Sequence, residues 1–231
     1  MKNPYAKVTH LKKRKFKLVL RLFCEDLSAT QIARLANVNR KTCNLWLGRI
    51  RERISVLAKA EEFTDATSVQ VDESFFGGAI VPGTNRRWPM AQIIVVGLIT
   101  DGVKVRVEMI RKVEKSQILP VIHACCAPGA IVHTDGCPVY KALPVLGYKH
   151  ASVSHVDDEF SRYENGVCVT TNRIESFWDW SKNRLAKFNG IRLRDFRLHI
   201  KECEWRFNHR QDDIYTILLR EFRKYPLSNL V

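Results

Sequence analysis

The sequence predicts an α/β domain with a mixed five-stranded sheet and flanking helices, preceded by a small all-α domain. Apolar residues repeat with helical spacing through residues 1–60, where Lys and Arg are also concentrated. From Val69 onward, apolar runs of strand length alternate with helical patterns. We therefore expect a first domain at residues 1–60 and a second domain at residues 61–231.

The positive charge of the chain is concentrated in its first quarter. Residues 1–60 contain 15 Lys and Arg against 3 Asp and Glu, a net charge of +12, whereas residues 61–231 contain 23 against 21. Such an asymmetry favours the binding of a polyanion by the first domain.

The composition excludes several classes of protein. With 45% hydrophobic and 27% charged residues, the chain resembles ordinary globular proteins rather than disordered ones. The longest apolar run, residues 91–99, is too short to cross a membrane, and no secretion signal is visible, so we expect a cytoplasmic, nucleoid-associated protein. The seven cysteines are odd in number and form no C-x-x-C pair, which argues against a disulfide framework and a zinc ribbon.

The first domain is expected to contain three helices. One apolar stripe predicts the first, and its members are Phe16, Val19, Leu20 and Phe23. Ser28 and Gln31 form an S-x-x-Q capping box that opens a short second helix. We expect its buried side to consist of Ile32, Ala33, Leu35 and Ala36. Residues 37–39 predict a tight turn, because Asn accepts left-handed geometry, and a third helix follows from about Arg40.

A short helix, a tight turn and a longer helix form the helix-turn-helix pattern. The N-terminal part of the longer helix then meets base edges in the major groove, where Arg can bind guanine and Asn can bind adenine. We expect DNA contacts from Arg40, Lys41, Thr42 and Asn44. The alternative is a three-helix bundle that contacts proteins, and the local charge favours DNA.

Five strands and four helices are expected in the second domain. The strands lie at 69–76, 92–100, 103–110, 130–133 and 148–153, and the helices at 116–126, 139–146, 172–188 and 194–207. The RNase H-like fold has this order of elements: three antiparallel strands, followed by two parallel strands that are joined through helices. We therefore expect that fold.

Two aspartates lie on strands that this order makes neighbours: Asp72 in the first strand and Asp135 just after the fourth. Because side chains alternate along a strand, Asp72 and Glu73 face opposite sides of the sheet. Asp72 shares its side with Gln70 and Ser74, so we expect Asp72 to bind metal and Glu73 to lie behind it. A buried carboxylate pair needs a cation, and Mg²⁺ prefers carboxylate oxygens.

A third carboxylate is expected from the helix at 172–188. Its packing stripe consists of Ile174, Phe177, Trp178 and Leu185. Glu175 and Lys182 lie on an adjacent stripe, which predicts a metal ligand and an ammonium group that could hold a phosphate. The alternative for Glu175 is a helix-capping pair with Asn172.

Three segments with strongly patterned residues carry a family resemblance. They are residues 71–78 (VDESFFGG), residues 133–136 (HTDG) with Tyr140, and residues 171–178 (TNRIESFW) with Lys182. Over about residues 65–210 the chain resembles the bacterial insertion-sequence DDE transposases of the group related to eukaryotic Merlin elements. Part of that group has Asn in place of the third acidic residue, so Asn172 stays an alternative to Glu175.

The resemblance implies a DNA transposase that uses two Mg²⁺ or Mn²⁺ ions per active site. Its catalytic residues would be Asp72, Asp135, Glu175 and Lys182, the first three being the metal ligands. It would cleave at terminal inverted repeats and join the 3′-ends to target DNA. The implied partners are double-stranded DNA and further copies of the chain, because two ends must be brought together. Two alternatives stay open: a structure-specific nuclease or resolvase on the same fold, and a helix-turn-helix regulator with a non-catalytic second domain.

Overall fold

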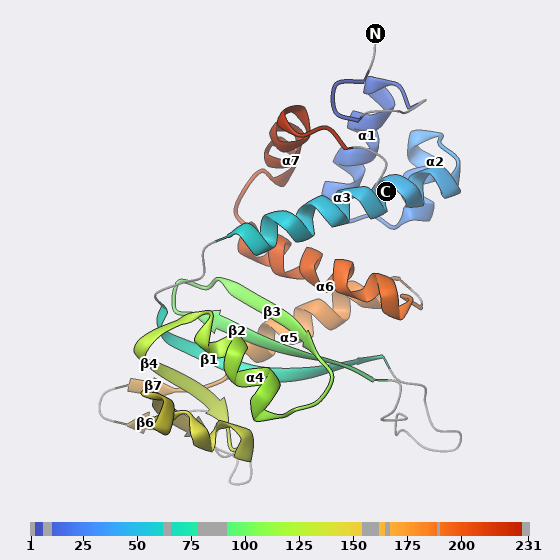
Figure 1. Ribbon diagram of the computed structural model, residues 1–231. Coiled ribbons are helices and arrows are strands. Elements are labelled where there is room, and N and C mark those ends of the chain that lie inside the picture. Colours follow the sequence, from blue (N-terminus) through green and yellow to red (C-terminus); the bar gives the residue numbers. More distant parts are fainter. Residues whose placement is uncertain are drawn as a thin grey trace, which may run out of the picture. The chain divides into compact units, whose positions relative to one another are not determined.

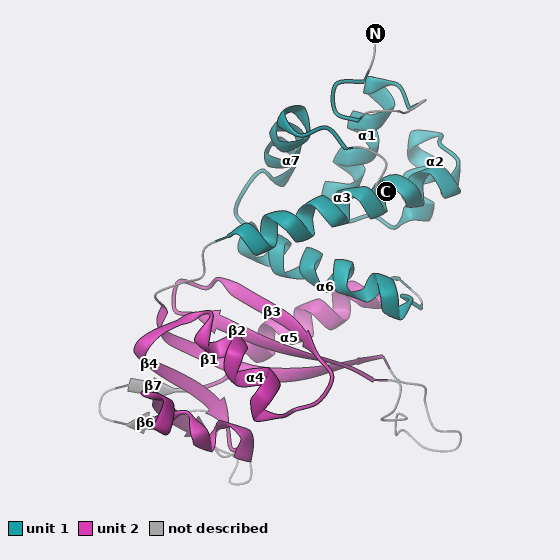
Figure 2. Cartoon of the chain, in the orientation of Figure 1, with its two compact units in different colours: residues 1–61, 187–231 teal, residues 62–186 magenta. Residues whose placement is uncertain are grey.

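The computed structural model describes residues 3–6, 11–61, 66–77, 92–153, 162–164, 167–188 and 190–227. The chain forms two compact units (Figure 2). Unit 1 contains residues 1–61 and 187–231, and unit 2 contains residues 62–186. The C-terminal helices therefore belong to the same unit as the N-terminal helices, whereas the sequence led us to expect them in the second domain.

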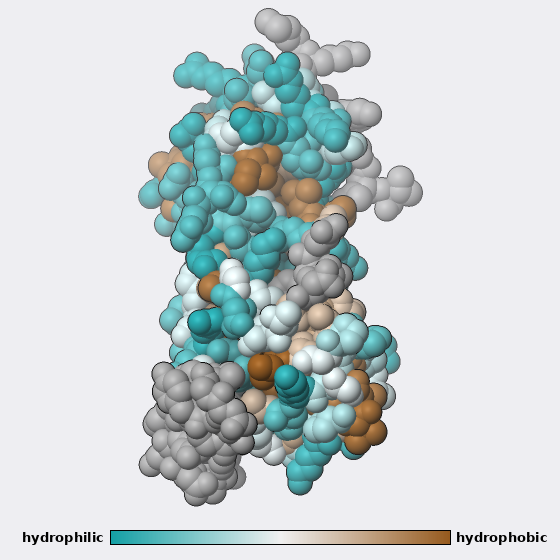
Figure 3. All heavy atoms as spheres, turned by 90° about the vertical axis from the view of Figure 1, so that its left-hand side faces the viewer, coloured by the Kyte–Doolittle hydropathy of each residue, from teal (hydrophilic) through white to brown (hydrophobic). Residues whose placement is uncertain are grey.

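Unit 1 is built only from helices (Figure 1). They are α1 (Lys13–Cys24), α2 (Ala29–Ala36), α3 (Arg40–Ala60), α6 (Leu193–Asn208) and α7 (Ile214–Lys224). On the face that Figure 3 shows, this unit is mainly hydrophilic, with small hydrophobic patches. That surface fits the excess of Lys and Arg in its N-terminal part.

The first three helices begin and end where the sequence predicts. The Ser28 side chain accepts a hydrogen bond from Gln31 N, and the Gln31 side chain accepts one from Ser28 N, which completes the capping box. Asn37 follows α2 in the left-handed conformation with φ 47°, and Asn39 caps α3. The expected burial of Leu35 is wrong, because 54% of its surface is exposed.

The core of unit 1 joins residues from both ends of the chain. Phe16 of α1 packs edge-on against Trp46 of α3 and against Phe222 of α7. Trp205 of α6 and Leu218 of α7 are buried in the same cluster. Because these large apolar side chains complete one core, the N-terminal helices share their hydrophobic stabilisation with residues 187–227.

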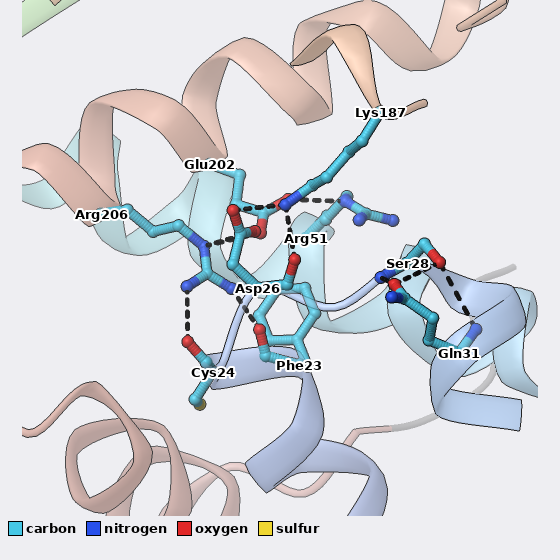
Figure 4. Close-up of polar contacts among 9 residues, drawn as sticks. All are labelled: Phe23, Cys24, Asp26, Ser28, Gln31, Arg51, Lys187, Glu202 and Arg206. Carbon is cyan, nitrogen blue, oxygen red and sulfur yellow. Dashed lines mark hydrogen bonds and ion pairs between the residues drawn. The ribbon is translucent and has the colours of Figure 1, made fainter. Parts of the chain in front are cut away.

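A buried group of charges also joins the two ends of the chain in unit 1 (Figure 4). Glu202 of α6 accepts hydrogen bonds from Arg51 of α3 at 2.7 Å and from Arg206 at 2.8 Å. Arg206 also donates to the carbonyl oxygens of Phe23 and Cys24, at the end of α1. The charge of each buried group is therefore matched by a partner.

Unit 2 contains a five-stranded sheet in the order β3-β2-β1-β4-β5 (Figure 1). The strands are β1 (Ala66–Gly77), β2 (Gln92–Thr100), β3 (Val105–Ile110), β4 (Cys126–Asp135) and β5 (Lys149–Val153). β2 pairs antiparallel with β1 and β3, whereas β4 pairs parallel with β1 and β5. This mixed sheet confirms the RNase H-like arrangement that the sequence predicts.

Helices pack on this sheet through residues from its two faces. α4 (Lys115–His123) packs with the face of Val69 and Val71, and its Ile118 and Ile122 are buried there. α5 (Asn172–Ala186) contacts β1 and β2. A short hairpin of β6 (Arg162–Glu164) and β7 (Val167–Val169) completes the described elements of this unit.

Some boundaries in unit 2 differ from those predicted. Residues 139–146 form two 3₁₀ turns, η2 (Pro138–Ala142) and η3 (Pro144–Leu146), because Pro144 lacks the N–H that a continuous helix needs. Gly77 ends β1 with φ 75°, and Gly78 lies outside the described residues. None of the helices in the described ranges combines the length and apolar character needed to cross a membrane.

Candidate active site

Asp72 and Asp135 lie at corresponding positions of two adjacent parallel strands. The ladder between β1 and β4 has Gln70 opposite His133 as its last pair. Asp72 and Asp135 each follow this pair by two residues, so they stand at the same end of neighbouring strands. The pKa of Asp72 is raised to about 6, chiefly by burial and in addition by the negative charges of Asp135 and Glu175. The sheet therefore brings the two predicted aspartates together.

The start of α5 is attached to the same strand through Gln70. The buried Gln70 side chain accepts hydrogen bonds from Arg173 N at 3.0 Å and from Ile174 N at 3.2 Å. Backbone N–H groups in the first turn of a helix have no partner within the helix. A strand residue thus caps α5, and it stands two positions before Asp72 on the same face of the sheet.

Trp178 fixes the next turn of α5 against the sheet. The residue opposite Asp72 on β2 is Gly97, and a Cβ atom at Gly97 would lie 2.5 Å from Cζ2 of Trp178. The indole ring therefore occupies the space that any side chain at this position would need. The Trp178 ring also packs edge-on against Phe76 of β1.

The Trp178 ring lies beside the Asp72 carboxylate. Its buried N–H lowers the pKa of Asp72, opposing the effect of burial, although this N–H meets no acceptor at hydrogen-bonding geometry among the described residues.

Glu175 lies one turn before Trp178, and its charge acts on Asp72. Thr171 Oγ1 donates a hydrogen bond of 2.6 Å to Glu175 Oε1, so this carboxylate is held at the start of α5. Asn172, the alternative third residue, is the exposed first residue of α5. Because Gln70 caps the first turn, helix capping does not require an Asn172–Glu175 pair.

Glu73 faces the opposite side of the sheet from Asp72, as the alternation predicts. Tyr140 of η2 donates a hydrogen bond of 2.7 Å to Glu73 Oε1. The pKa of Glu73 is raised to about 7, chiefly by burial; the Tyr140 hydroxyl opposes this rise, and the charges of Asp135 and Asp72 contribute to it. Tyr140 is buried in the core that also contains Val69 and Val71.

Lys182 lies two turns after Glu175 on α5 and is exposed. Its Nζ atom lies 6.0 Å from the centre of the Phe76 ring.

Asp135 is held by the turn that follows β4, where Cys137 N donates to Asp135 Oδ1 at 3.1 Å. His133 is buried, and its Nε2 atom lies 3.2 Å from Ser68 Oγ, so its role is in packing.

The donor set at this end of the sheet has the chemistry that a hard divalent cation needs. The charged neighbours that act on Asp72 are both carboxylates, and gathering carboxylates is unfavourable without a cation. Oxygen ligands of this kind suit Mg²⁺ and Mn²⁺. Within the described ranges, however, no three His, Cys, Asp or Glu side chains stand close enough together to hold a metal ion. Glu175 in particular is turned toward Thr171 by their hydrogen bond.

The predicted DNA-contacting residues lie together at the start of α3 in unit 1. Arg40, Lys41 and Asn44 are exposed, and Thr42 is half-buried. The Asn39 side chain accepts a hydrogen bond of 2.8 Å from Lys41 N, which fixes the first turn of this helix.

Sequence reasoning missed three residues that position the carboxylates. A glycine inside an apolar strand indicates close approach of another element, so Gly97 in β2 was a signal from which the contact with α5 could have been predicted. Gln70 was placed on the Asp72 face but not as a helix cap, and Thr171 carried no signal of its contact with Glu175. Both of these contacts depend on where α5 docks.

Comparison with known proteins gives a family match over most of the chain. The family model of the ISXO2-like transposase domain matches residues 66–208. A protein of Haemophilus influenzae, described as an uncharacterized transposase-like protein, is 34% identical over 124 residues, which are 54% of this chain and 97% of the relative.

Solved structures with similar chains include complexes of the Mos1 transposase. In its paired-end complex with the left transposon end, the sequence identity is 12% and the TM-score 0.38, with 90% of this chain and 79% of that chain covered. In the Mos1 mariner paired-end complex with Mn the values are 13% and 0.34, with 90% and 78% covered. The fold of unit 2 is defined by its own strand order.

Proposed function

This chain belongs to the ISXO2-like transposase family, and we propose that it cleaves DNA at terminal inverted repeats and joins the freed 3′-ends to target DNA. The observation that carries the proposal is the placement of Asp72 and Asp135 at one end of adjacent parallel strands, with Glu175 acting on Asp72 from α5. Such a group of carboxylates is what metal-dependent phosphoryl transfer requires.

Asp72, Asp135 and Glu175 would hold the divalent ions, Mg²⁺ or Mn²⁺. Two bound ions would supply activation of the attacking hydroxyl and stabilisation of the leaving oxygen. The raised pKa of Asp72 supports this role. Burial and the neighbouring carboxylates disfavour the charged form of Asp72, and a bound metal ion would stabilise that form. Glu175 would leave its hydrogen bond with Thr171 and turn toward Asp72.

The remaining residues would orient the groups that react. Tyr140 holds Glu73 behind the aspartates, so Glu73 would support the ligands rather than bind the metal. Lys182 is exposed on α5 and would bind a phosphate of the DNA strand near the reacting bond. No covalent intermediate with the chain is needed, because a hydroxyl group attacks the phosphate directly.

Unit 1 would bring the chain to DNA. Arg40, Lys41, Thr42 and Asn44 lie at the N-terminal end of α3, the part of a recognition helix that meets base edges in the major groove. Because two transposon ends must be cleaved and joined together, we further propose that the active form contains more than one copy of the chain.

An assay that follows cleavage and joining separately tests this function. The purified chain would be incubated with the terminal DNA of its own element, a supercoiled target plasmid and Mg²⁺ or Mn²⁺. We expect joined products from the parent chain and none from Asp72→Asn, Asp135→Asn or Glu175→Gln, with DNA affinity retained in all three. Asp179→Asn is the matched control, because Asp179 is exposed on α5 one turn after Glu175.

The products also distinguish the alternatives. Cleaved ends without joined products from the parent chain would indicate a nuclease or resolvase, and DNA binding without any cleavage would indicate a regulator. An Asn172→Ala variant decides which residue is the third ligand. We expect the Asn172→Ala chain to keep its activity. If Asn172→Ala is inactive and Glu175→Gln is fully active, Asn172 is the third ligand instead of Glu175.

A further inference from the structure

We infer that one face of the chain segment after α5, the face that lines a cavity beside α3, contacts DNA together with the recognition helix α3, so that the DNA-binding site combines both ends of the chain. We call this segment the arm; it consists of residues 187–188 and 190–199. The inference rests on the proposed DNA binding by unit 1, to which the arm and α3 both belong.

The arm, α3 and the start of α2 line an open cavity of about 710 Å³. One wall is the start of α2, with Ser28, Ala29 and Thr30. The second wall is α3, and the third is the arm, which contributes Lys187, Phe188, Arg192 and Asp195 among others. The cavity therefore lies where residues distant in the sequence meet within one unit.

The face of α3 that lines this cavity includes two of the predicted DNA contacts. Arg40, Asn44, Gly48 and Arg51 line the cavity and recur at the spacing of one helical face. Lys41 is not among the lining residues. A DNA strand bound by Arg40 and Asn44 in this cavity would therefore pass beside the arm.

The lining contains four cations and one acid. They are Arg40, Arg51, Lys187 and Arg192 against Asp195. Arg51 is bonded to the buried Glu202, and Lys187 is paired with Asp26, so these two cations belong to the walls (Figure 4). That leaves Arg40 and Arg192 as the cations that can bind an incoming anion.

Arg40 and Arg192 are both accessible to a ligand. Arg40 is exposed and forms no ion pair with the described residues. The Arg192 side chain is 67% exposed and pairs with Asp195 at 2.6 Å. An ion pair in solvent contributes little free energy, so a phosphate can replace Asp195 as the partner of Arg192. The guanidinium group matches phosphate in a two-bond geometry.

Ion pairs hold the arm in place before any ligand binds. Lys187 contacts both the carboxylate and the carbonyl oxygen of Asp26, in the turn between α1 and α2. Glu202 of α6 accepts hydrogen bonds from Arg51 of α3 and from Arg206 of α6 (Figure 4). The arm includes the first turns of α6. Because these contacts hold the arm against α3 and the turn between α1 and α2, binding requires little ordering of the arm. Double-stranded DNA, whose backbone presents regularly spaced phosphates, is the partner that this surface fits.

Fluorescence anisotropy with a labelled mixed-sequence DNA duplex tests the inference in the full chain over a series of salt concentrations. Backbone contacts do not depend on sequence, so this probe is sufficient. We expect Arg192→Gln to weaken binding by about tenfold and to reduce the slope of log affinity against log salt by about 1. Arg194→Gln is the matched control, because Arg194 is 73% exposed two residues further along the arm but does not line the cavity.

A variant with the opposite expected effect makes the test two-sided. Asp195→Asn removes the acid that competes for Arg192, so binding should become tighter and more dependent on salt. Equal affinities of the Arg192→Gln and Arg194→Gln chains would overturn the inference. Arg40→Gln distinguishes failure of this inference from failure of the proposed DNA binding by α3. If Arg40→Gln weakens binding while Arg192→Gln does not, α3 binds DNA without the arm. If Arg40→Gln also binds like the parent, the proposed site on α3 falls with it. Unchanged thermal melting of each variant shows that folding is not the cause.

Discussion

Trp178 of α5 lies directly on Gly97 of β2, the residue that pairs with Asp72 across the sheet. The absence of a side chain at Gly97 lets α5 approach the strands closely. Glu175 stands one turn before Trp178, and its charge raises the pKa of Asp72. The distance between a helix and a sheet thus determines how near the third carboxylate comes to the first.

Gly97→Ala should separate these elements. A Cβ atom at this position would lie 2.5 Å from the Trp178 ring, so the ring must move. We expect a loss of about 1–3 kcal/mol in the free energy of unfolding, measured with urea, and a strong loss of DNA cleavage. Gly102→Ala in the turn after β2 is the control, because its Cβ would meet only Thr100 Oγ1 at 3.7 Å. A Gly97→Ala chain as stable and active as this control would contradict the account.

Glu202→Gln should unfold the helical unit far more readily than Glu221→Gln. Glu202 is fully buried between Arg51 and Arg206, so its loss takes the carboxylate from the buried Arg51 and leaves Arg206 with the more distant Asp26, at a cost of about 3–5 kcal/mol. Glu221 pairs with Arg53 at 2.9 Å, but both side chains are partly exposed, so its loss should cost roughly 0.5 kcal/mol. Chemical denaturation followed by circular dichroism measures both values. Similar losses in the two variants would show that the buried charges do not hold this unit together.

The sequence predicts the local features of the fold well. The capping box at Ser28, the left-handed Asn37 and the alternation that separates Asp72 from Glu73 all depend on residues a few positions apart, and all are found. The strand order, and with it the approach of Asp72 and Asp135, also followed from the order of the elements.

The missing features depend on contacts between distant residues. Glu202 reads as a charged surface residue of a C-terminal helix until its partner Arg51, 151 residues earlier, is known. For the same reason the sequence does not show that residues 187–231 share a compact unit with residues 1–61. Leu35 and Leu45 are apolar, yet both are exposed, because a pattern of single residues does not show which side of a helix a distant partner covers.

The contribution of Asp72 and Glu73 to the stability of the chain without divalent cations should fall as the pH rises from about 4 to about 7. The folded chain has the pKa of Asp72 raised to about 6 and that of Glu73 raised to about 7, from ordinary values of 3.8 and 4.5. Folding therefore favours the protonated carboxyls. This contribution is fully present below the ordinary values and is lost as the pH passes the raised ones.

Denaturation of the parent and of the Asp72→Asn, Glu73→Gln double variant at a series of pH values checks this dependence. His209, held between Glu61 and Asp212, also has a raised pKa and changes stability in the same direction in both chains. The difference between the chains therefore isolates the two carboxyls. Parallel curves would refute the expected dependence.

The most direct test of the central claim is the binding of Mn²⁺ alone, measured by electron paramagnetic resonance at a pH above 7, where the carboxyls of the folded chain are ionised. Without DNA, the parent chain should bind Mn²⁺, and Asp179→Asn should bind it equally. Asp72→Asn and Asp135→Asn should each lose this binding. Unchanged Mn²⁺ binding by the Asp135→Asn chain would contradict the claim that Asp72, Asp135 and Glu175 together form the metal site.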